Sequence, residues 1–102
     1  MKLTLQPNEM IIRAGNSNLL RNGHKFNGKL IVTNQRIYFR TVCEDNEQNN
    51  KEINPDEISE LYFFNTMWIF PNGISIKTKS GENILFKVSN RNAWAKIITK
   101  MY

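Results

Sequence analysis

The sequence predicts a mainly β fold with a single helix at its C-terminal end. The 102 residues include 12 isoleucines and 11 aromatic residues, which favour strands, and 15 asparagines with three Asn-Gly pairs, which favour tight turns. Only the segment from about residue 90 spaces its apolar residues at helical intervals. A chain of this length forms one core, so we expect a single domain over residues 1–102, with strands over about 9–88 and the helix over about 90–102.

Residues 27–40, NGKLIVTNQRIYFR, predict a β-hairpin at the centre of the sheet. Leu30, Val32, Ile37 and Phe39 can all point inward from two extended segments. The polar residues between Val32 and Ile37 form the bend, so the remaining strands should lie on either side of this hairpin.

The residues before this hairpin predict a short strand and a long loop. Residues 7–9 form a turn, and residues 10–14 form a strand that Gly15 ends. The stretch 15–25 holds two glycines, three asparagines and several basic residues, so we expect a flexible loop. A loop of this size is a candidate binding site.

The stretch after the hairpin predicts a polar connection followed by a short strand. Residues 42–50 are rich in asparagine and acids and should face solvent, and residues 51–53 form the strand. Pro55 suits the first position of one 3₁₀ turn, and Asn54 can cap it.

Two more hairpins follow in the second half of the chain. Residues 59–64, SELYFF, form a strand with apolar side chains on both faces, and the apolar run 67–70 leads to a turn at 71–73. Residues 74–79 alternate as a half-exposed strand, and a turn at 80–83 leads to a last strand over 84–88.

The last segment predicts an amphipathic helix. Trp94, Ile97, Ile98 and Met101 recur at spacings of three and four residues, and Ser89 or Asn90 can act as its N-cap. A helix of about three turns is only marginally stable alone, so it must pack on the sheet. We expect Trp94 to be the side chain that it buries there.

The hairpin residues and the order of the elements resemble the GRAM branch of the pleckstrin-homology-like superfamily. Six positions match the pattern of that family: Gly28, Leu30, Thr33, Arg36, Ile37 and Phe39. The resemblance implies a bent, seven-stranded antiparallel sandwich or partly open barrel that a C-terminal helix closes. It also implies a binding module without catalysis, because family members bind anionic lipids, proteins or peptides.

The residue inventory does not predict an enzyme. His24 is the only histidine and Cys43 the only cysteine, so we expect no histidine-based triad, no metal centre, no cofactor and no internal disulfide. No signal peptide and no membrane span are expected, which predicts a cytoplasmic protein. The high use of asparagine, isoleucine and lysine suggests a bacterial source.

Charge along the chain is segregated. Residues 1–42 carry a net charge of +6, residues 43–62 carry −6, and residues 63–102 carry +5. The basic segments could share one face suited to anions, or they could be ordinary solvated strand faces. Arg36 has two alternatives as well, a ligand contact or a structural pairing with a carboxylate, and we favour the structural role.

Two binding hypotheses follow. The first is weak binding of anionic lipid headgroups at a membrane surface. The first loop and the strand after it would provide the site, through Arg21, His24, Lys25 and Lys29. The arginine of the Lys/Arg-x-Arg pair that phosphoinositide-binding members carry is absent after Lys29, so tight recognition is not expected.

The second and preferred hypothesis is protein interaction or self-association. It rests on the apolar residues Tyr62, Phe64, Met67, Trp68 and Phe70, which the bent sheet either wraps or leaves exposed as a patch for a protein partner or a second copy. Nucleic acid is not an expected partner, because the sequence contains no recognition motif and its middle segment is acidic.

Overall fold

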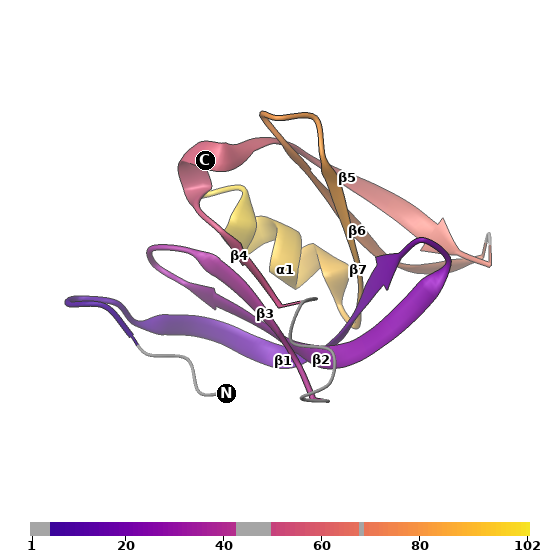
Figure 1. Cartoon of the computed structure of the whole chain (residues 1–102), viewed down its shortest axis with the longest axis horizontal. Helices are drawn as coiled ribbons and strands as arrows, with labels where there is room; N and C mark the ends of the chain where they lie inside the picture. The colour runs from indigo at the N-terminus through magenta and orange to yellow at the C-terminus, as the bar shows by residue number, and fades with distance from the viewer. Residues whose placement is uncertain (1–4, 43–49, 68) are drawn as a thin grey trace.

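The computed structural model describes residues 5–42, 50–67 and 69–102, which form one antiparallel sheet and one α-helix (Figure 1). The elements in chain order are β1 (Ile11–Arg21), β2 (His24–Thr33), β3 (Ile37–Thr41), β4 (Lys51–Ile53), the 3₁₀ turn η2 (Pro55–Glu57), β5 (Ile58–Thr66), β6 (Phe70–Thr78), β7 (Asn83–Val88) and α1 (Arg91–Ile98). No helix in these ranges is long and apolar enough to cross a membrane.

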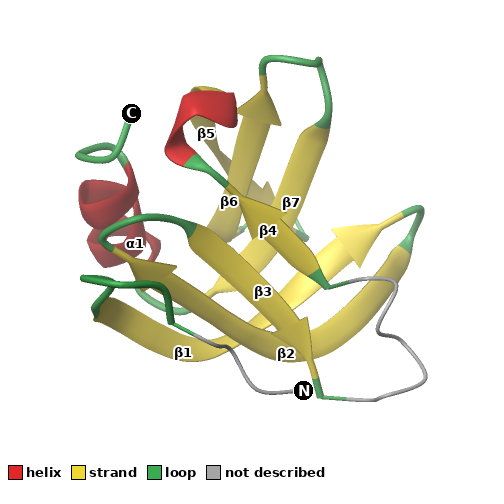
Figure 2. Ribbon diagram, turned by 60° about the vertical axis from the view of Figure 1, so that its left-hand side comes forward, coloured by secondary structure: helices red, strands yellow, loops and turns green. Residues whose placement is uncertain are grey.

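The seven strands form a single sheet in the order β4-β3-β2-β1-β7-β6-β5. Figure 2 shows this sheet curled on itself, with β4 and β5 at its two edges and α1 beside the opening. The predicted fold, a bent seven-stranded antiparallel sheet with a C-terminal helix, is confirmed. The predicted connection over residues 42–50 lies largely outside the described residues.

The hairpin predicted over residues 27–40 is formed by β2 and β3. Its predicted place at the centre of the sheet is wrong, because β1 is the middle strand in the order. Leu30 pairs with Phe39 and Val32 pairs with Ile37, and all four side chains are fully buried. The ring of Phe39 packs against Phe86 of β7 with 5.5 Å between the ring centroids, so the core joins both halves of the sheet.

The first strand is much longer than the sequence predicted. Gly15 does not end it, and no loop occupies residues 15–25, because β1 and β2 pair continuously from Ser17 opposite Gly28 to Arg21 opposite His24. The turn between them is only Asn22-Gly23, where both residues have positive φ, 52° and 79°. Asn-Gly suits this tight turn, which matches the twist of the paired strands.

The predicted turn at residues 71–73 is also wrong, because these residues belong to β6. The turn between β5 and β6 instead includes Met67, with φ of 50°, and Ile69. Pro71 lies before the first β6 residue that pairs with β7, Gly73, so its missing N–H breaks no bond to β7. A side chain at Gly73 would overlap the ring of Phe64, since its Cβ would lie 2.5 Å from the ring carbons.

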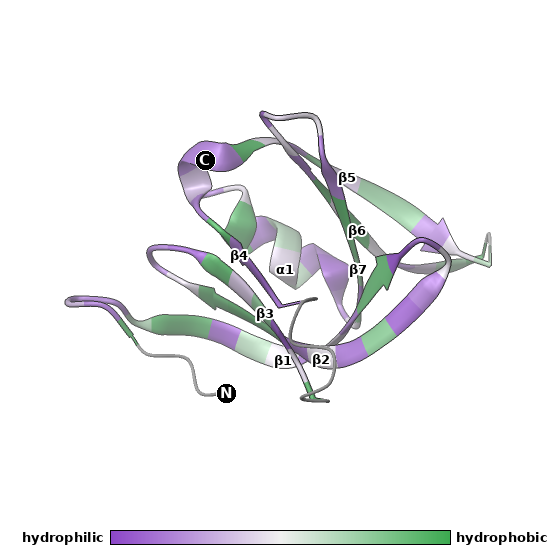
Figure 3. Cartoon of the chain, viewed as in Figure 1, coloured by the Kyte–Doolittle hydropathy of each residue, from purple (hydrophilic) through white to green (hydrophobic). Residues whose placement is uncertain are grey.

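Figure 3 shows hydrophobic and hydrophilic stretches along β1 and β2 rather than a strict alternation. Burial identifies the core face, because Leu19 and Leu30 are buried while Lys29 between Gly28 and Leu30 is exposed. Gly28 lies near the middle of β2 and faces the core. A Cβ there would lie 2.3 Å from the carbonyl oxygen of Arg40 and 2.7 Å from the ring of Phe39. Only glycine permits this close approach, at which β3 lies tightly against β2.

The helix closes the fold through Trp94, as predicted. The indole is 2% exposed and packs over Gly15 of β1, where an added Cβ would lie 3.2 Å from the ring, and the guanidinium of Arg13 lies 4.9 Å from the ring centroid. The helix is shorter than predicted and ends at Ile98. Asn90 occupies the N-cap position with a left-handed backbone, but its side chain makes no capping bond.

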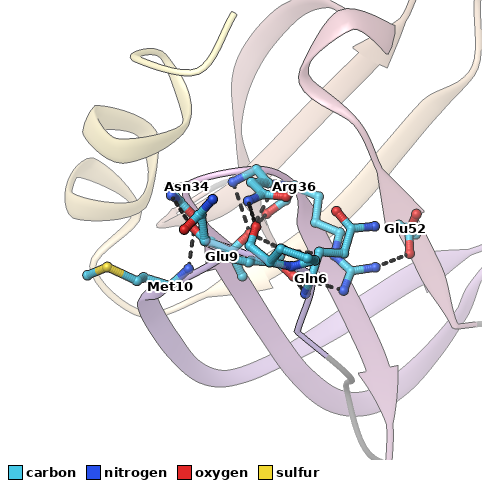
Figure 4. Close-up of polar contacts among 10 residues, drawn as sticks. Gln6, Glu9, Met10, Asn34, Arg36 and Glu52 are labelled. Carbon is cyan, nitrogen blue, oxygen red and sulfur yellow. Dashed lines mark hydrogen bonds and ion pairs between the residues drawn. The ribbon is translucent and has the colours of Figure 1, made fainter.

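The N-terminal segment is held on the sheet by a buried polar cluster (Figure 4), which we call the Glu9 clasp. The Glu9 carboxylate accepts hydrogen bonds from Arg36 at 2.9 and 3.1 Å, from the Thr33 hydroxyl at 2.6 Å and from the backbone N–H of Gln6 at 2.8 Å. Arg36 also donates to Glu52 of β4 at 2.6 Å. The structural role predicted for Arg36 is therefore confirmed.

The clasp lowers the pKa of Glu9 from 4.5 to about 2, chiefly because Arg36 donates hydrogen bonds to the carboxylate. Burial acts in the opposite direction, and the bonds from Thr33 and Gln6 reinforce the lowering. The pKa of Arg36 is raised, first by its hydrogen bonds to Glu9. Both groups stay charged at neutral pH.

Replacing Trp94 tests the closure of the fold. We expect Trp94→Ala to lower the free energy of unfolding by about 3–5 kcal/mol, because it removes a buried indole and leaves a cavity against β1. Urea denaturation measures the loss. The matched control is Lys96→Ala at an exposed position of the same helix, which should change stability by less than about 0.5 kcal/mol. Equal effects of the two substitutions would contradict the role of the indole.

Acid titration tests the Glu9 clasp. The folded pKa lies below the unfolded one, so the clasp contributes fully above pH 4.5 and its contribution is lost as the pH falls toward 2. We expect unfolding free energies measured across this range to fall by at most about 1.4 kcal/mol per pH unit from this group. Glu9→Gln should be about 3 kcal/mol less stable at neutral pH and should lose this acid dependence. The exposed Glu60→Gln should keep it, and a Glu9→Gln protein with the wild-type pH profile would disprove the assignment.

Candidate interaction surfaces

The four basic residues predicted to bind lipid do not form one cluster. Arg21 and His24 face each other across the β1–β2 turn, and the His24 ring lies 6.3 Å from Phe26, on the same side of β2. Lys25 follows His24 in the strand and therefore projects to the opposite, outer face. Lys29 lies four residues further along this outer face. All four side chains are exposed. Arg21 and His24 lie on one face of the hairpin, and Lys25 and Lys29 lie on the other.

The outer face of the central strands gathers lysines from distant parts of the sequence. Asn18 of β1 lies between Asn27 of β2 and Lys87 of β7, and Lys29 lies opposite Asn16 in the adjacent row. Because directly opposed residues project to the same side, these side chains share the outer face. We call Lys25, Lys29 and Lys87 the lysine face.

Sequence reasoning missed Lys87 as part of a site. The alternation of residues 84–88 indicated that Lys87 faces outward, but the neighbours of β7 in the sheet were unknown. The Asn22-Gly23 pair was the signal for the β1–β2 hairpin, which brings Asn16, Asn18 and Asn27 together. Lys25 and Lys29 from the N-terminal basic segment and Lys87 from the C-terminal one lie on this face.

A shallow groove crosses the middle of β1. Its volume is about 560 Å³, and residues of β1, β2, β6 and β7 line it. We call it the asparagine groove, because Asn16, Asn18, Asn27 and Asn72 line it together with Lys87. None of the described residues that line the groove is acidic.

A second surface is apolar and lies on the β5–β6 hairpin. We call it the β5–β6 surface, and it consists of Tyr62, Phe63, Met67, Ile69 and Phe70. Tyr62 and Phe63 are neighbours in β5 and project to opposite faces of the hairpin, while Met67 and Ile69 lie at its turn. Met67 is 80% exposed and Ile69 73%, while Tyr62 is 45% exposed. The turn of this hairpin projects at the right of Figure 1, away from α1.

Among the residues predicted for protein interaction, Tyr62 and Met67 are therefore exposed. Phe64 is half-buried because its ring covers Gly73, and Trp68 lies outside the described residues. The predicted faces of β5 are confirmed, since Leu61 pairs with the buried Ile76 and Tyr62 pairs with Ser75 on the other side.

The first residue of α1 supports this surface. The guanidinium of Arg91 lies 4.4 Å from the ring centroid of Phe63 and donates a hydrogen bond to the backbone carbonyl of Phe64 at 2.8 Å. These contacts hold the C-terminal half of β5 against the start of the helix. β5 is also the last strand of the sheet, so one of its edges has no partner strand among the described residues.

The Glu9 clasp uses its charges internally. The described residues contain no group of three or more histidine, cysteine, aspartate or glutamate side chains that could hold a metal ion.

Three solved structures share this fold. The C-terminal domain of an unknown protein from Leishmania infantum is similar with a TM-score of 0.77 at 18% identity, covering 93% of this chain and 86% of that chain. The Vps36 N-terminal PH domain has a TM-score of 0.73 at 15% identity, covering 96% and 82%. Inner Membrane Complex Sub-compartment Protein 3 from Toxoplasma gondii has a TM-score of 0.66 at 15% identity, covering 86% and 73%. At these identities the likeness shows the fold alone.

The family follows from the sequence comparison. No curated protein matches the sequence. The profile of the GRAM domain, however, matches residues 1–101, almost the whole chain. GRAM and pleckstrin-homology-like domains are typically binding modules without catalysis, in agreement with the surfaces described above. The chain belongs to the GRAM domain family.

Proposed function

We propose that this chain is a protein-interaction module and that the β5–β6 surface is its contact site. The observation that carries the proposal is the exposure of five large apolar side chains on one hairpin. Surfaces of this kind are costly in water and mark sites of association. Methionine, aromatic residues and arginine are also the residues that protein interfaces favour at their cores.

The open edge of β5 favours a protein over a lipid at this site. An edge strand presents unpaired backbone N–H and C=O groups that another polypeptide can satisfy by adding a strand. A hydrocarbon layer cannot satisfy them. The aromatic residues of β5 then lie beside the edge that would receive the partner chain, which is either another protein or a second copy of this one.

Polar substitutions on the hairpin turn test the proposal. We expect Met67→Ser combined with Ile69→Ser to weaken self-association or partner binding at least about tenfold, because buried apolar anchors carry most of the energy of such interfaces. Light scattering over a range of protein concentrations measures self-association. Met10→Ser combined with Ile12→Ser is a matched control, because both residues are exposed apolar side chains at the start of the chain and not on this hairpin.

A photoreactive amino acid identifies the partner if the protein is monomeric. Placed at position 69 in living cells, it should form a protein adduct that is absent when the same group stands at position 12. A strict monomer in solution whose position 69 captures only lipid would refute the proposal. Capture of the same proteins in equal amounts from positions 69 and 12 would also refute it.

Weak binding of anionic lipid headgroups at the end of the β1–β2 hairpin is the second candidate function. The exposure of Arg21, His24 and Lys25 around a two-residue turn favours it. Each basic residue close to an anionic membrane contributes about 1 kcal/mol, so the attraction should be weak and sensitive to salt.

Vesicle co-sedimentation at low salt tests this candidate. Anionic vesicles should retain more protein than neutral vesicles, and Lys25→Gln should reduce the difference several-fold. Lys96→Gln removes the same charge from the exposed side of α1 and should have little effect. Equal retention on anionic and neutral vesicles would exclude the function.

A further inference from the structure

We propose that Asn22 is a site of spontaneous deamidation, at which the side-chain amide becomes a carboxylate without the help of an enzyme. The site is the turn of the β1–β2 hairpin, and the inference does not rest on the function proposed above. The sequence contains three Asn-Gly pairs: Asn22-Gly23, Asn27-Gly28 and Asn72-Gly73. The fold leaves the first pair free to react and holds the other two in paired strands.

The reaction proceeds through a cyclic imide. The backbone nitrogen of Gly23 loses its proton and attacks the side-chain carbonyl carbon of Asn22. A new C–N bond forms, the bond from this carbon to the amide nitrogen breaks, and the amide nitrogen leaves as ammonia, taking up the equivalent of the proton that Gly23 lost. Water then adds to one of the two imide carbonyl carbons and opens the ring, so the product is aspartate or isoaspartate. Glycine suits the attacking position, because it has no side chain to hinder ring closure.

The β1–β2 turn leaves both reacting groups accessible. Asn22 and Gly23 are exposed, and an added Cβ at Gly23 would meet no atom within 4 Å. Neither the Asn22 side chain nor the Gly23 N–H forms a hydrogen bond with another described residue. The backbone of such a surface turn can rotate to bring the nitrogen to the side-chain carbon without breaking the strand pairing.

Strand β2 protects the second Asn-Gly pair. Gly28 is buried, and it is paired with Ser17 of β1 on one side and with Thr41 of β3 on the other. The side-chain oxygen of Asn27 accepts a hydrogen bond from Asn18 at 2.5 Å. The glycine nitrogen therefore cannot turn toward the Asn27 side chain unless the strands separate.

Strand β6 protects the third pair in the same way. Gly73 is buried and is paired with Phe64 of β5 and with Lys87 of β7. The side-chain oxygen of Asn72 accepts a hydrogen bond from the Thr66 hydroxyl at 2.6 Å. Reaction at this pair requires local opening of the sheet, so its rate is reduced in proportion to the small open population.

Deamidation changes the charge and the shape of the hairpin end. A carboxylate forms beside Arg21 and close in sequence to Lys25, so the local positive charge falls. An Asp-Gly pair still suits the tight turn. Isoaspartate adds a methylene group to the backbone, which disturbs the pairing of Arg21 with His24 across this two-residue turn. The attraction of this end of the protein for anions should therefore decline as the protein ages.

Peptide mapping of the full-length protein after incubation for several days at mildly alkaline pH tests the inference. Cleavage after lysine places the three pairs in the separate peptides 3–25, 26–29 and 52–77, and mass spectrometry measures the replacement of NH₂ by OH in each. A sample digested before the incubation corrects for reaction during digestion. We expect Asn22 to react at least about tenfold faster than Asn27 and Asn72, because the paired strands must open first.

The same incubation in urea is the matched control, because glycine follows the asparagine in all three pairs. Once the protein is unfolded, the three rates should become similar. Asn22→Gln should abolish the fast reaction, because its longer side chain does not close the same ring. The inference is overturned if Asn27 or Asn72 reacts as fast as Asn22 in the folded protein, or if Asn22 reacts only in urea. It is also overturned if the advantage of Asn22 persists unchanged in urea, because the fold would then not be its cause.

Discussion

The packing of Trp94 against Gly15 is the contact on which the rest of this structure depends. An eight-residue helix is not stable alone, so α1 exists because its indole is buried on β1. Gly15 favours the contact, since an added Cβ would lie 3.2 Å from the ring and the indole would have to shift by a few tenths of an ångström. The docked helix then places Arg91 against Phe63, which ties the start of α1 to β5.

This closure also determines which surfaces are left open. The helix covers the core at the opening of the curled sheet, as Figure 2 shows, while the β5–β6 turn extends away from it. The Glu9 clasp holds the N-terminal segment on β3 and β4 through Arg36 and Glu52. In the described ranges, neither the N-terminal segment nor the C-terminal helix covers the lysine face or the β5–β6 surface.

The prediction succeeded where a local pattern decides the structure. Leu30, Val32, Ile37 and Phe39 belong to two short apolar runs on either side of a polar bend, and all four are fully buried. Trp94 was identified for the same reason, because the helical spacing of the apolar residues leaves one face to be buried. Arg36 was assigned a structural role from the family pattern, but its partner Glu9 is 27 residues away and could not be read from the sequence.

The prediction failed where a glycine can serve either a turn or a close contact within a strand. All three Asn-Gly pairs favour turns, yet only Asn22-Gly23 forms one. Gly28 and Gly73 lie within strands, where neighbouring groups occupy the space that a side chain would need. These neighbours, the Arg40 carbonyl and the Phe64 ring, are close only in the folded sheet.

The amino-acid sequence by itself determined the mainly β class, the β2–β3 hairpin and the terminal helix, because these depend on the spacing of apolar residues along short segments. Only the tertiary structure decided which polar and apolar side chains share a surface. The reason is physical: a strand shows its two faces in its own sequence, but its neighbours are set by pairing between distant segments. Lys87 came to lie beside Asn18, and Arg21 and Lys25 came to lie on opposite faces, through that pairing alone.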